Sequence, residues 1–484
     1  MSFKHFLPGI LIMFLILSCQ TGLKKGKIIK IVASNVAELL NQNDVTNSED
    51  GFLLKNQSSA ISSKFKVRNF ELSAKVKTTP GAEGILVFAA PEVNAPDKGY
   101  VVKINNSDYR IGNPQKTGSL VKIRNNFVRT ATDNEWFDLS VIVKGNDIKV
   151  SVNNKVITEY TEPANVQRPA EISYRVLSDG FLSIVKSNAE GELLIGELMV
   201  LPLDDKLKTD VVTYNAEPDS LMKVVDQLNQ LEFPLIDFHG HLKGGLTMDQ
   251  ACQHARSNGY QYGIAANCGL KFPVTNDSTL NAYLDKISNE PVFKVMQAEG
   301  REWVTLFTPA AVARFDYIFT DAMTWTDNKG RRLRLWIPEE TFVDDEQQFM
   351  DMLVGKIEAV MSKEPVDIYV NPTFLPAKIM ADYDRLWTPG RMDRVIKVLK
   401  NNDVALEINA RYKIPSMAFL KRAKEAGLKF TFGTNNTTNN DLGRLEYCLK
   451  AIKELGLTSD DIFLPRSAKD KKVMRMGLPL KITG

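Results

Sequence analysis

Two histidines flank a single glycine in the segment "LIDFHGHLKGG", directly after an apolar run, and the whole chain contains only 4 histidines. In an extended strand, residues two apart project to the same side, so His239 and His241 are expected to face one side together. Two neutral imidazoles on one face favour a divalent metal such as zinc, manganese or iron. Histidines that only form hydrogen bonds in a polar cavity are the alternative interpretation.

Carboxylates that could complete a metal shell end other apolar segments of the same half of the chain. Glu299 follows "VMQA", Asp321 follows "YIFT" and Glu407 follows "VAL". A buried carboxylate without a partner costs several kcal/mol, so these groups require a metal, a cation or each other. Arg301 and Arg411 stand two and four residues beyond two of these acids. Ion pairs without a metal are therefore a second interpretation.

Other polar residues near these positions complete the predicted site. The predicted metal ligands, for one divalent ion, are His239, His241, Glu299 and Asp321. The predicted catalytic groups are Glu407, Lys243 and Arg301, with Glu407 as general base. The predicted substrate-binding residues are Arg411, Asn371 and Asn435. A solvated lysine is the alternative for Lys243, and buried packing is the alternative to a ligand role for Cys268.

The elements that must position these residues begin near Asp219. Seven strand-like runs alternate there with helical segments: "PLIDFHGH", "YGIAANC", "VFKVMQAEG", "DYIFTDAMT", "VDIYVNPTF", "VALEINARY" and "LKFTFGTNN". This alternation predicts a parallel α/β arrangement, and seven strands suit a barrel. The carboxyl ends of the strands share one face of a barrel, where sites are built. The candidate residues stand at these ends. The cluster in "DNKGRRLRLWI" predicts either an anion site or a charged hairpin.

The preceding half has a different periodicity. From about Phe52 to Leu203, short runs such as "FELSAKVKTT" and "FDLSVIVKGNDIKVSVNNKVI" alternate apolar and polar residues between turn residues. Period-two runs at close spacing predict an antiparallel sandwich or barrel. This half is therefore expected to be all-β.

Composition and the first residues restrict the class of protein further. At 484 residues the chain is expected to form two domains. The 61 basic and 58 acidic residues nearly balance, so we expect no nucleic-acid partner. A basic residue, an apolar run and "ILSC" open the chain, which is typical of a secretion signal. A plain signal peptide with an incidental Cys19 is the alternative to a lipoprotein signal. The three other cysteines predict no disulfide scaffold.

The second half resembles the polymerase and histidinol phosphatase (PHP) superfamily between about Phe233 and Pro465. The resemblance rests on the His-x-His strand end, Glu299 on the third strand, "NP", "LEIN" and "GTNN". It implies a distorted seven-stranded barrel and metal-dependent hydrolysis of phosphoesters. The chain departs from the pattern at several positions where the family has a metal ligand. The residues that stand there in this chain are Cys268, Met323 or its neighbour Asp321, Asn371 and Asn435. These departures leave one metal at most, or a non-catalytic relic.

The first half resembles the concanavalin-like domain of the 3-keto-disaccharide hydrolase family. The matching stretches are "GYVVKI", "KTGSLVKI", "NEWFDLSVIVKGNDIKVSVNNKVI" and "GELMVLPL". Val102 and Ala89 stand where that family carries a glutamate and an arginine, which weakens the case for catalysis here. Glu83 and Glu135 are the acids nearest the matched motifs. Sugar rings would find stacking faces on Tyr100, Tyr109, Trp136 and Tyr174, unless these belong to the core.

These observations together predict a multidomain chain. We expect a lipoprotein signal peptide at residues 1–18 with lipidation at Cys19, a concanavalin-like jelly-roll sandwich at 27–205, and a (βα)7 PHP-like barrel at 219–484. The expected function is hydrolysis in carbohydrate processing, on a carbohydrate or small-molecule substrate, by an exported periplasmic or outer-membrane lipoprotein anchored to the membrane. The alternative is a non-catalytic glycan-binding lipoprotein with two degenerate enzyme-like domains.

Overall fold

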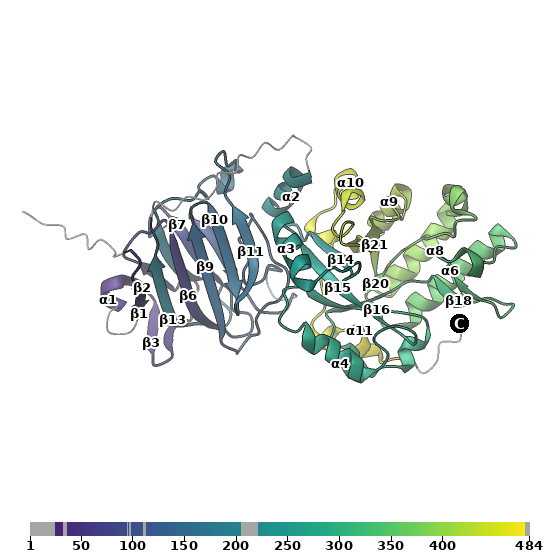
Figure 1. Ribbon diagram of the computed structural model, residues 1–484, viewed down its shortest axis with the longest axis horizontal. Coiled ribbons are helices and arrows are strands. Elements are labelled where there is room, and N and C mark those ends of the chain that lie inside the picture. Colours follow the sequence, from purple (N-terminus) through teal and green to yellow (C-terminus); the bar gives the residue numbers. More distant parts are fainter. Residues whose placement is uncertain are drawn as a thin grey trace, which may run out of the picture.

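The computed structural model describes residues 25–31, 36–93, 95, 98–109, 113–204 and 221–479. Two domains lie side by side, a β-sandwich and a barrel surrounded by helices (Figure 1). The predicted signal peptide and Cys19 lie outside the described residues. Among the described helices, none has the length and apolar character needed to span a bilayer.

The larger sheet of the sandwich runs in the order β11-β10-β9-β6-β13-β4-β3, and β1 also pairs with β13. Its neighbouring strands are antiparallel. The strands are β1 (Ile29–Ile31), β3 (Val45–Ser48), β4 (Gly51–Leu54), β6 (Phe70–Thr78), β9 (Phe137–Lys144), β10 (Asp147–Val152), β11 (Lys155–Thr161) and β13 (Leu193–Pro202). The predicted period-two runs are confirmed, because alternate residues of β6 are buried.

The second sheet runs in the order β2-β5-β12-β7-β8 and is also antiparallel. Its strands are β2 (Leu40–Asn43), β5 (Ala60–Ser63), β7 (Gly84–Ala90), β8 (Tyr100–Ile104) and β12 (Phe181–Lys186), with the short α1 (Val36–Leu39) before β2. Phe70 of one sheet and Phe88 of the other meet with their ring centroids 5.8 Å apart. The apolar faces of the two sheets thus form one core, as a sandwich requires.

The second domain is a closed barrel of seven parallel strands in chain order, which confirms the predicted fold. The strands are β14 (Ile236–Gly240), β15 (Gln261–Cys268), β16 (Phe293–Ala298), β17 (Tyr317–Thr320), β20 (Ile368–Tyr369), β21 (Ala405–Asn409) and β22 (Phe430–Gly433). The first and last strands pair through Asp237 and Phe432. All seven correspond to the runs identified in the sequence.

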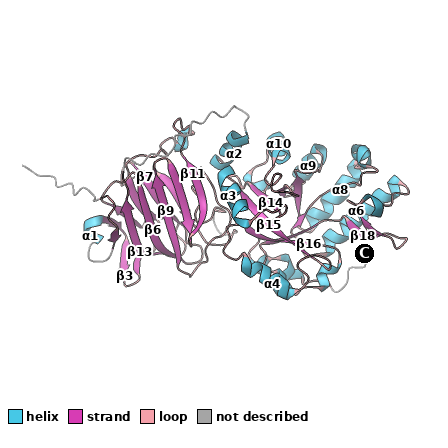
Figure 2. Cartoon of the chain, in the orientation of Figure 1, coloured by secondary structure: helices cyan, strands magenta, loops and turns pink. Residues whose placement is uncertain are grey.

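Helices connect and cover these strands (Figure 2). They are α2 (Leu221–Gln230), α3 (Met248–Asn258), α4 (Asp277–Lys286), α5 (Pro309–Val312), α6 (Glu346–Lys363), α7 (Tyr383–Leu386), α8 (Pro389–Asn401), α9 (Met417–Glu425), α10 (Glu446–Leu455) and α11 (Lys472–Met476). Several begin at a capping side chain; Thr247 and Gln250 form a capping box at α3. The predicted arginine cluster lies in a hairpin of β18 (Thr324–Thr326) and β19 (Arg332–Arg334), where Arg331 pairs with Asp327. The charged-hairpin interpretation is therefore confirmed.

The domains meet through both apolar and polar contacts. Phe127 and Val128 belong to the sandwich domain in sequence, yet they pack into the apolar core of the barrel domain. Beside them, the backbone N–H of Asn125 donates to Oδ1 of Asn229 over 2.9 Å, and Nδ2 of Asn125 donates to the carbonyl of Asn229 over 2.6 Å. The interface is therefore continuous with the core of the barrel.

Candidate functional site

The carboxyl ends of the barrel strands bring the predicted histidines and acids to one face of the barrel. His239 and His241 lie at and just beyond the end of β14, with their ring centroids 5.2 Å apart. Glu407 lies on β21, while Glu299 and Asp321 directly follow β16 and β17. The parallel order of the strands places these ends together, as in other barrels of this kind.

His239 is fixed by a carboxylate behind it. Its Nδ1 lies 2.6 Å from Oε1 of Glu407, and both side chains are buried. An ionised carboxylate only accepts hydrogen bonds, so Nδ1 of His239 is the donor in this pair, and in a neutral ring Nε2 then keeps its lone pair. That Nε2 is buried and has no hydrogen-bond partner in the described part of the chain. This arrangement resembles the carboxylate–histidine pairs that orient metal ligands.

His241 presents a second imidazole nitrogen of the same kind. Its Nε2 is also buried and without a hydrogen-bond partner among the described residues. Burial, together with the nearby His239 and Lys243, holds the pKa of His241 well below its usual range, so the ring is neutral at physiological pH. Its backbone N–H donates to Oδ1 of Asn436 over 2.7 Å, which fixes the end of β14 against the segment after β22. A neutral imidazole is the form that binds a metal.

Amides and a backbone N–H satisfy the other oxygen of Glu407. Oε2 accepts from the backbone N–H of Asn371 over 2.6 Å and from Nδ2 of Asn409 over 3.0 Å. Nδ2 of Asn435 in turn donates to Oδ1 of Asn371 over 2.8 Å. The predicted substrate-binding residues Asn371 and Asn435 thus belong to one network with Glu407. Because both of its oxygens are engaged, Glu407 is placed to hold His239 in position, and its role as general base stays a prediction.

Glu299 and Asp321 form a second acidic group at the mouth of the barrel. Oε1 of Glu299 accepts from Nδ2 of Asn267 over 2.6 Å. Burial and the negative charge of Asp321 raise the pKa of Glu299 to about 7, and burial also raises the pKa of Asp321. A carboxyl group with such a pKa exchanges a proton readily near neutral pH. The pair therefore provides carboxylate oxygens for a cation or a group for proton transfer.

Arg301 is held in place by a partner that the sequence did not reveal. Its Nη1 lies 2.5 Å from Oε1 of Glu364, the buried residue that ends α6, and Nη2 donates to Oγ1 of Thr320 over 2.8 Å. Oε2 of Glu364 accepts from Nε1 of Trp303 over 2.7 Å. The positive charge of Arg301 nevertheless offsets part of the increase in the pKa values of Glu299 and Asp321. Among the described residues, Arg301 thus forms its salt bridge with Glu364 and not with Glu299, the acid considered from the sequence.

Lys243 and Arg411 are the more accessible cations of the predicted site. Arg411 is exposed, and its Nη1 donates to the carbonyl of Asn435 over 3.3 Å. Burial and the charge of Arg411 lower the pKa of Lys243, whereas Glu299 raises it. Lys243 therefore lies near both Arg411 and Glu299. Cys268, by contrast, is buried with its thiol 3.4 Å from the carbonyl of Ala266, which agrees with a packing role.

The donors at the barrel mouth are of the chemical kind that binds a divalent metal. The two unpartnered Nε2 atoms of His239 and His241 are the fixed part of this set. Among the described residues, however, no group of three or more His, Cys, Asp or Glu side chains is arranged to hold a metal ion. A metal held by the two histidines would need a further ligand, and Glu299 and Asp321 are the carboxylates at the same mouth.

Some residues of this network were not included in the predicted site. Asp237 is buried two residues before His239, and its Oδ1 accepts from the backbone N–H groups of His239 and Thr434 over 3.1 and 3.0 Å. Asn409 and Asn436 bind Glu407 and the backbone of His241 as described above. The sequence feature that could have identified these residues is their position at or near the ends of predicted strands. Their partners, more than 150 residues away for Asp237 and Asn436, were not visible in the sequence.

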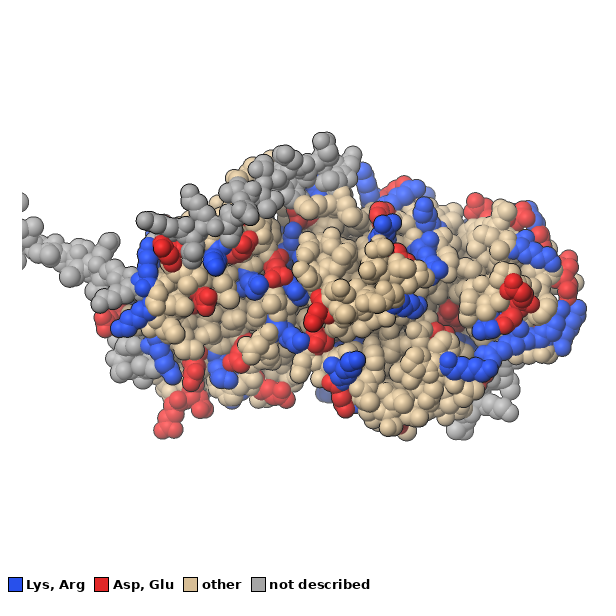
Figure 3. Space-filling model, viewed as in Figure 1, with Lys and Arg blue, Asp and Glu red and all other residues tan. Residues whose placement is uncertain are grey.

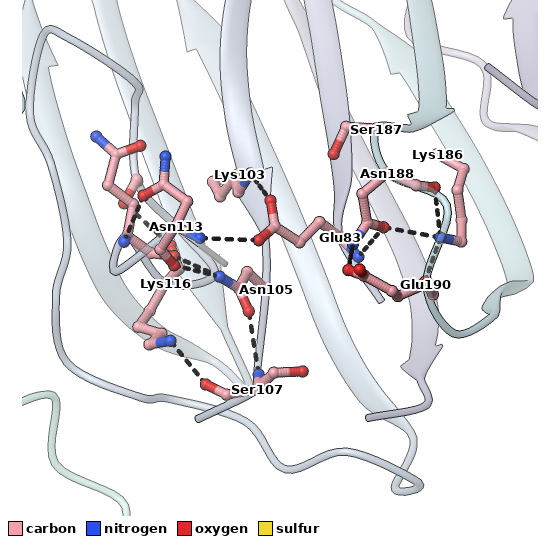
Figure 4. A network of polar contacts seen from close by, with 12 residues as sticks. Glu83, Lys103, Asn105, Ser107, Asn113, Lys116, Lys186, Ser187, Asn188 and Glu190 are labelled. Carbon is pink, nitrogen blue, oxygen red and sulfur yellow. Dashed lines mark hydrogen bonds and ion pairs between the residues drawn. The ribbon is translucent and has the colours of Figure 1, made fainter. Parts of the chain in front are cut away.

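A second group of buried charges lies in the sandwich (Figure 4). Oε2 of Glu83 lies 2.5 Å from Nζ of Lys103, and Oε1 accepts from the backbone N–H of Asn113 over 3.1 Å. Nζ of Lys116 donates to the carbonyl of Ser107 over 2.6 Å. Nζ of Lys186 contacts both the carbonyl and Oδ1 of Asn188. Each of these charges has its own partners, so the network stabilises the fold as it stands.

The aromatic residues considered for sugar stacking differ in exposure. Tyr100 is fully buried and stacks on Phe88 with the ring centroids 5.3 Å apart. Tyr109 donates to the carbonyl of Phe127 and packs at the domain interface. Trp136 is 38% exposed and lies near Nζ of Lys77. Tyr100 and Tyr109 are therefore core residues, and Trp136 keeps an accessible face.

Comparison with known proteins supports the assignment of the sandwich. The sequence profile of the 3-keto-alpha-glucoside-1,2-lyase-like domain matches residues 35–192, which is less than half of the chain. No curated protein matches the chain.

Similar solved structures are found for each half of the chain. A protein described as a glycosyl hydrolase from Parabacteroides distasonis is 18% identical, with a TM-score of 0.32, over 37% of this chain and 100% of its own. A histidinol phosphate phosphatase from Lactococcus lactis, complexed with zinc, L-histidinol and phosphate, is 13% identical, with a TM-score of 0.35, over 49% of this chain and 98% of its own. A carbohydrate-binding module from Bacillus subtilis is 14% identical, with a TM-score of 0.24, over 36% of this chain and 94% of its own.

Proposed function

We propose that the barrel is a metal-assisted hydrolase site that acts on a glycoside or keto-glycoside. The observation that carries this proposal is the pair of buried, unpartnered Nε2 atoms on His239 and His241. An acceptor nitrogen that is buried without a partner is costly, and a bound cation removes that cost. A divalent metal would lower the pKa of a bound water and polarise the bond to be broken.

The residues of the chain have separate tasks in this proposal. His239 and His241 hold the cation, and Glu407 keeps the His239 ring in the orientation and tautomer that present Nε2. One of the two acids, Glu299 or Asp321, supplies the missing carboxylate ligand. The other acid exchanges a proton with the reacting groups. Lys243 and Arg411 lie where they can orient the substrate at the rim.

The carbohydrate class of the substrate is inferred from the sandwich. Its match to the 3-keto-alpha-glucoside-1,2-lyase-like domain supports a sugar-processing role for the chain. The buried charges of the sandwich satisfy one another, so the proposal assigns the chemistry to the barrel and sugar recognition to the sandwich. The imidazole nitrogens without hydrogen-bond partners, Nε2 of His239 and His241, lie at the barrel mouth.

Metal analysis of the purified full chain tests the barrel site. We expect about one equivalent of zinc, manganese or iron in the wild type and its loss in His239→Ala and His241→Ala. His254→Gln is the matched control, because His254 lies on α3 and contacts Tyr262 instead of the site. Asp321→Asn and Glu299→Gln identify the carboxylate ligand, which is the one whose amide variant loses the metal. A wild type that binds no divalent metal would refute the proposal.

Activity measurements separate this function from its alternative. The metal-loaded protein is expected to hydrolyse members of a panel of glycosides and 3-keto-glycosides, and His239→Ala is expected to be inactive. Saccharide binding without turnover, with no effect of chelation on thermal stability, would instead establish the non-catalytic glycan-binding alternative.

We also propose that the chain is an exported lipoprotein anchored through Cys19. The support is the apolar segment followed by "ILSC" at the start of the sequence. In the bacterial host, labelled palmitate is expected to be incorporated into the wild type and not into Cys19→Ala. Equal labelling of both chains, or none of either, would contradict the lipid anchor.

A further inference from the structure

A cleft of about 840 Å³ lies between the two domains, away from the barrel mouth. One wall is formed by β10, β11 and the segment that follows β11, and the other by α2 and α3. Figure 1 shows β11 facing these helices. The volume falls within the range of about 300–1,000 Å³ typical of small-molecule sites. A ligand in this cleft would contact both domains at once.

Salt bridges pair three of the five basic side chains that line the cleft with two of its three acidic side chains. Arg124 pairs with Asp226 across the domain boundary with an N···O distance of 2.6 Å. Arg256 pairs with Glu159 across the same boundary over 2.8 Å, and Lys149 adds a contact of 3.1 Å to Glu159. Acidic and basic side chains also lie next to one another along this boundary in Figure 3. The cleft therefore offers both hydrogen-bond donors and acceptors, and its lining has a small excess of basic side chains.

Several amide side chains line the cleft. Gln167, Gln227 and Gln230 line it, and none of their side chains forms a hydrogen bond within the described residues. An amide both donates and accepts, as a sugar hydroxyl does. Three unpaired amides on opposite walls thus suit a ligand that carries many hydroxyl groups.

One wall of the cleft is made rigid by stacked planar groups. The guanidinium carbons of Arg124 and Arg168 lie 5.2 and 5.4 Å from the centroid of the Tyr160 ring. Nη2 of Arg168 also donates to the hydroxyls of Tyr160 over 2.7 Å and of Tyr100 over 3.1 Å. This wall is anchored in the sandwich core, since Tyr100 is fully buried. Such prior ordering lowers the entropic cost of binding.

We propose that this cleft binds a neutral oligosaccharide. The cleft has few of the apolar side chains that anchor a bound peptide. Apart from two prolines, the aliphatic or thioether side chains among its described lining residues are Ile148, Val166 and Met222. The inference goes beyond the function proposed for the barrel, because binding here requires no metal and no catalysis. The cleft would hold a glycan chain at a distance from the barrel mouth.

Isothermal titration of the full-length protein with neutral hexasaccharides tests this proposal. Maltohexaose, cellohexaose and xylohexaose are the probes, and hexagalacturonate is the acidic comparison. We expect at least one neutral hexasaccharide to bind and the double variant Gln167→Ala/Gln227→Ala to bind it at least tenfold more weakly. Gln347→Ala on α6 is the matched control, because this exposed glutamine lies outside the cleft.

A second comparison separates this cleft from the barrel site. The double variant His239→Ala/His241→Ala is expected to keep its affinity for the hexasaccharide within twofold, whatever happens to metal content or turnover. Affinity that is lost in the histidine variant and kept in the glutamine variant would overturn the proposal. No binding of any neutral hexasaccharide, or binding of hexagalacturonate alone, would overturn it as well.

Discussion

Lys116 is fully buried in the sandwich, where Nζ donates to the carbonyl of Ser107 and lies 4.5 Å from the centroid of the Tyr109 ring. Burial, together with the positive charge of the nearby Arg129, lowers its pKa from 10.5 to about 8. Below pH 8 the folded protein must keep a charged amine in this environment. As the pH rises from 8 to 10.5, only the unfolded chain retains the proton, and stability should increase.

We therefore predict that the wild type gains stability over Lys116→Met across this pH range. The shift corresponds to a change of about 3 kcal/mol in the difference between their free energies of unfolding. Urea unfolding of both proteins at pH 7, 8, 9 and 10 measures it. Comparing the two chains cancels the contribution of other lysines, including Lys472, whose pKa burial also lowers to about 8. A pH-independent difference would show that Lys116 has an ordinary pKa.

Single residues also show what the sequence can and cannot predict. The His-x-His spacing on one strand was enough to place His239 and His241 together, because strand geometry alone determines which residues share a side. The partner of Arg301 was not predictable in this way. Glu364 lies 63 positions later, at the end of a helix outside the barrel, and only the packing of α6 brings its carboxylate to Arg301.

At the scale of elements, periodicity predicted the order and type of the barrel strands better than their lengths. "VDIYVNPTF" was expected to be a strand, yet β20 pairs only through Ile368 and Tyr369. Asn371 and Thr373 have positive φ values of 46° and 61°, which end the extended backbone there. The same turn directs the N–H of Asn371 to Glu407. The departure from a regular strand is thus part of how the site is built.

The end of β22 must lack a side chain for the site to form. A methyl group added at Gly433 would lie 2.0 Å from Oε1 of Glu407 and 2.9 Å from Cβ of His239. We predict that Gly433→Ala pushes these residues apart, lowers the free energy of unfolding by about 1–3 kcal/mol and weakens metal binding. Calorimetry and metal titration measure the two effects.

Gly355 supplies the control for this substitution. It lies within α6, and an added methyl group would meet no atom within 4 Å. Gly355→Ala is therefore expected to stabilise the protein by about 0.5–1 kcal/mol without changing metal affinity. Unchanged metal affinity in Gly433→Ala would contradict the close packing of β22 against His239 and Glu407.

At the scale of the whole molecule, the sequence indicated two domains without showing how they are joined. The change of periodicity near residue 205 separated the all-β part from the α/β part. The sequence did not predict that Phe127 and Val128 pack in the barrel core. Apolar residues within the segment of the sandwich are expected to pack in the core of the sandwich. Phe127 and Val128 thus anchor the sandwich domain to the barrel, while each domain keeps a core of its own.

Asn229 tests whether the domains unfold together. Its Oδ1 accepts from the backbone N–H of Asn125, and its Nδ2 donates to the carbonyls of Val225 and Gly259 over 3.0 and 2.9 Å. Asn229→Ala removes these three hydrogen bonds from buried backbone groups. We therefore expect the free energy of unfolding to fall by about 2–4 kcal/mol. Because the bond to Asn125 joins the domains, the single calorimetric transition expected for the wild type should separate into two. The exposed Asn401→Ala on α8 should keep one transition. Two transitions already present in the wild type would show that the contacts between the domains do not couple their unfolding.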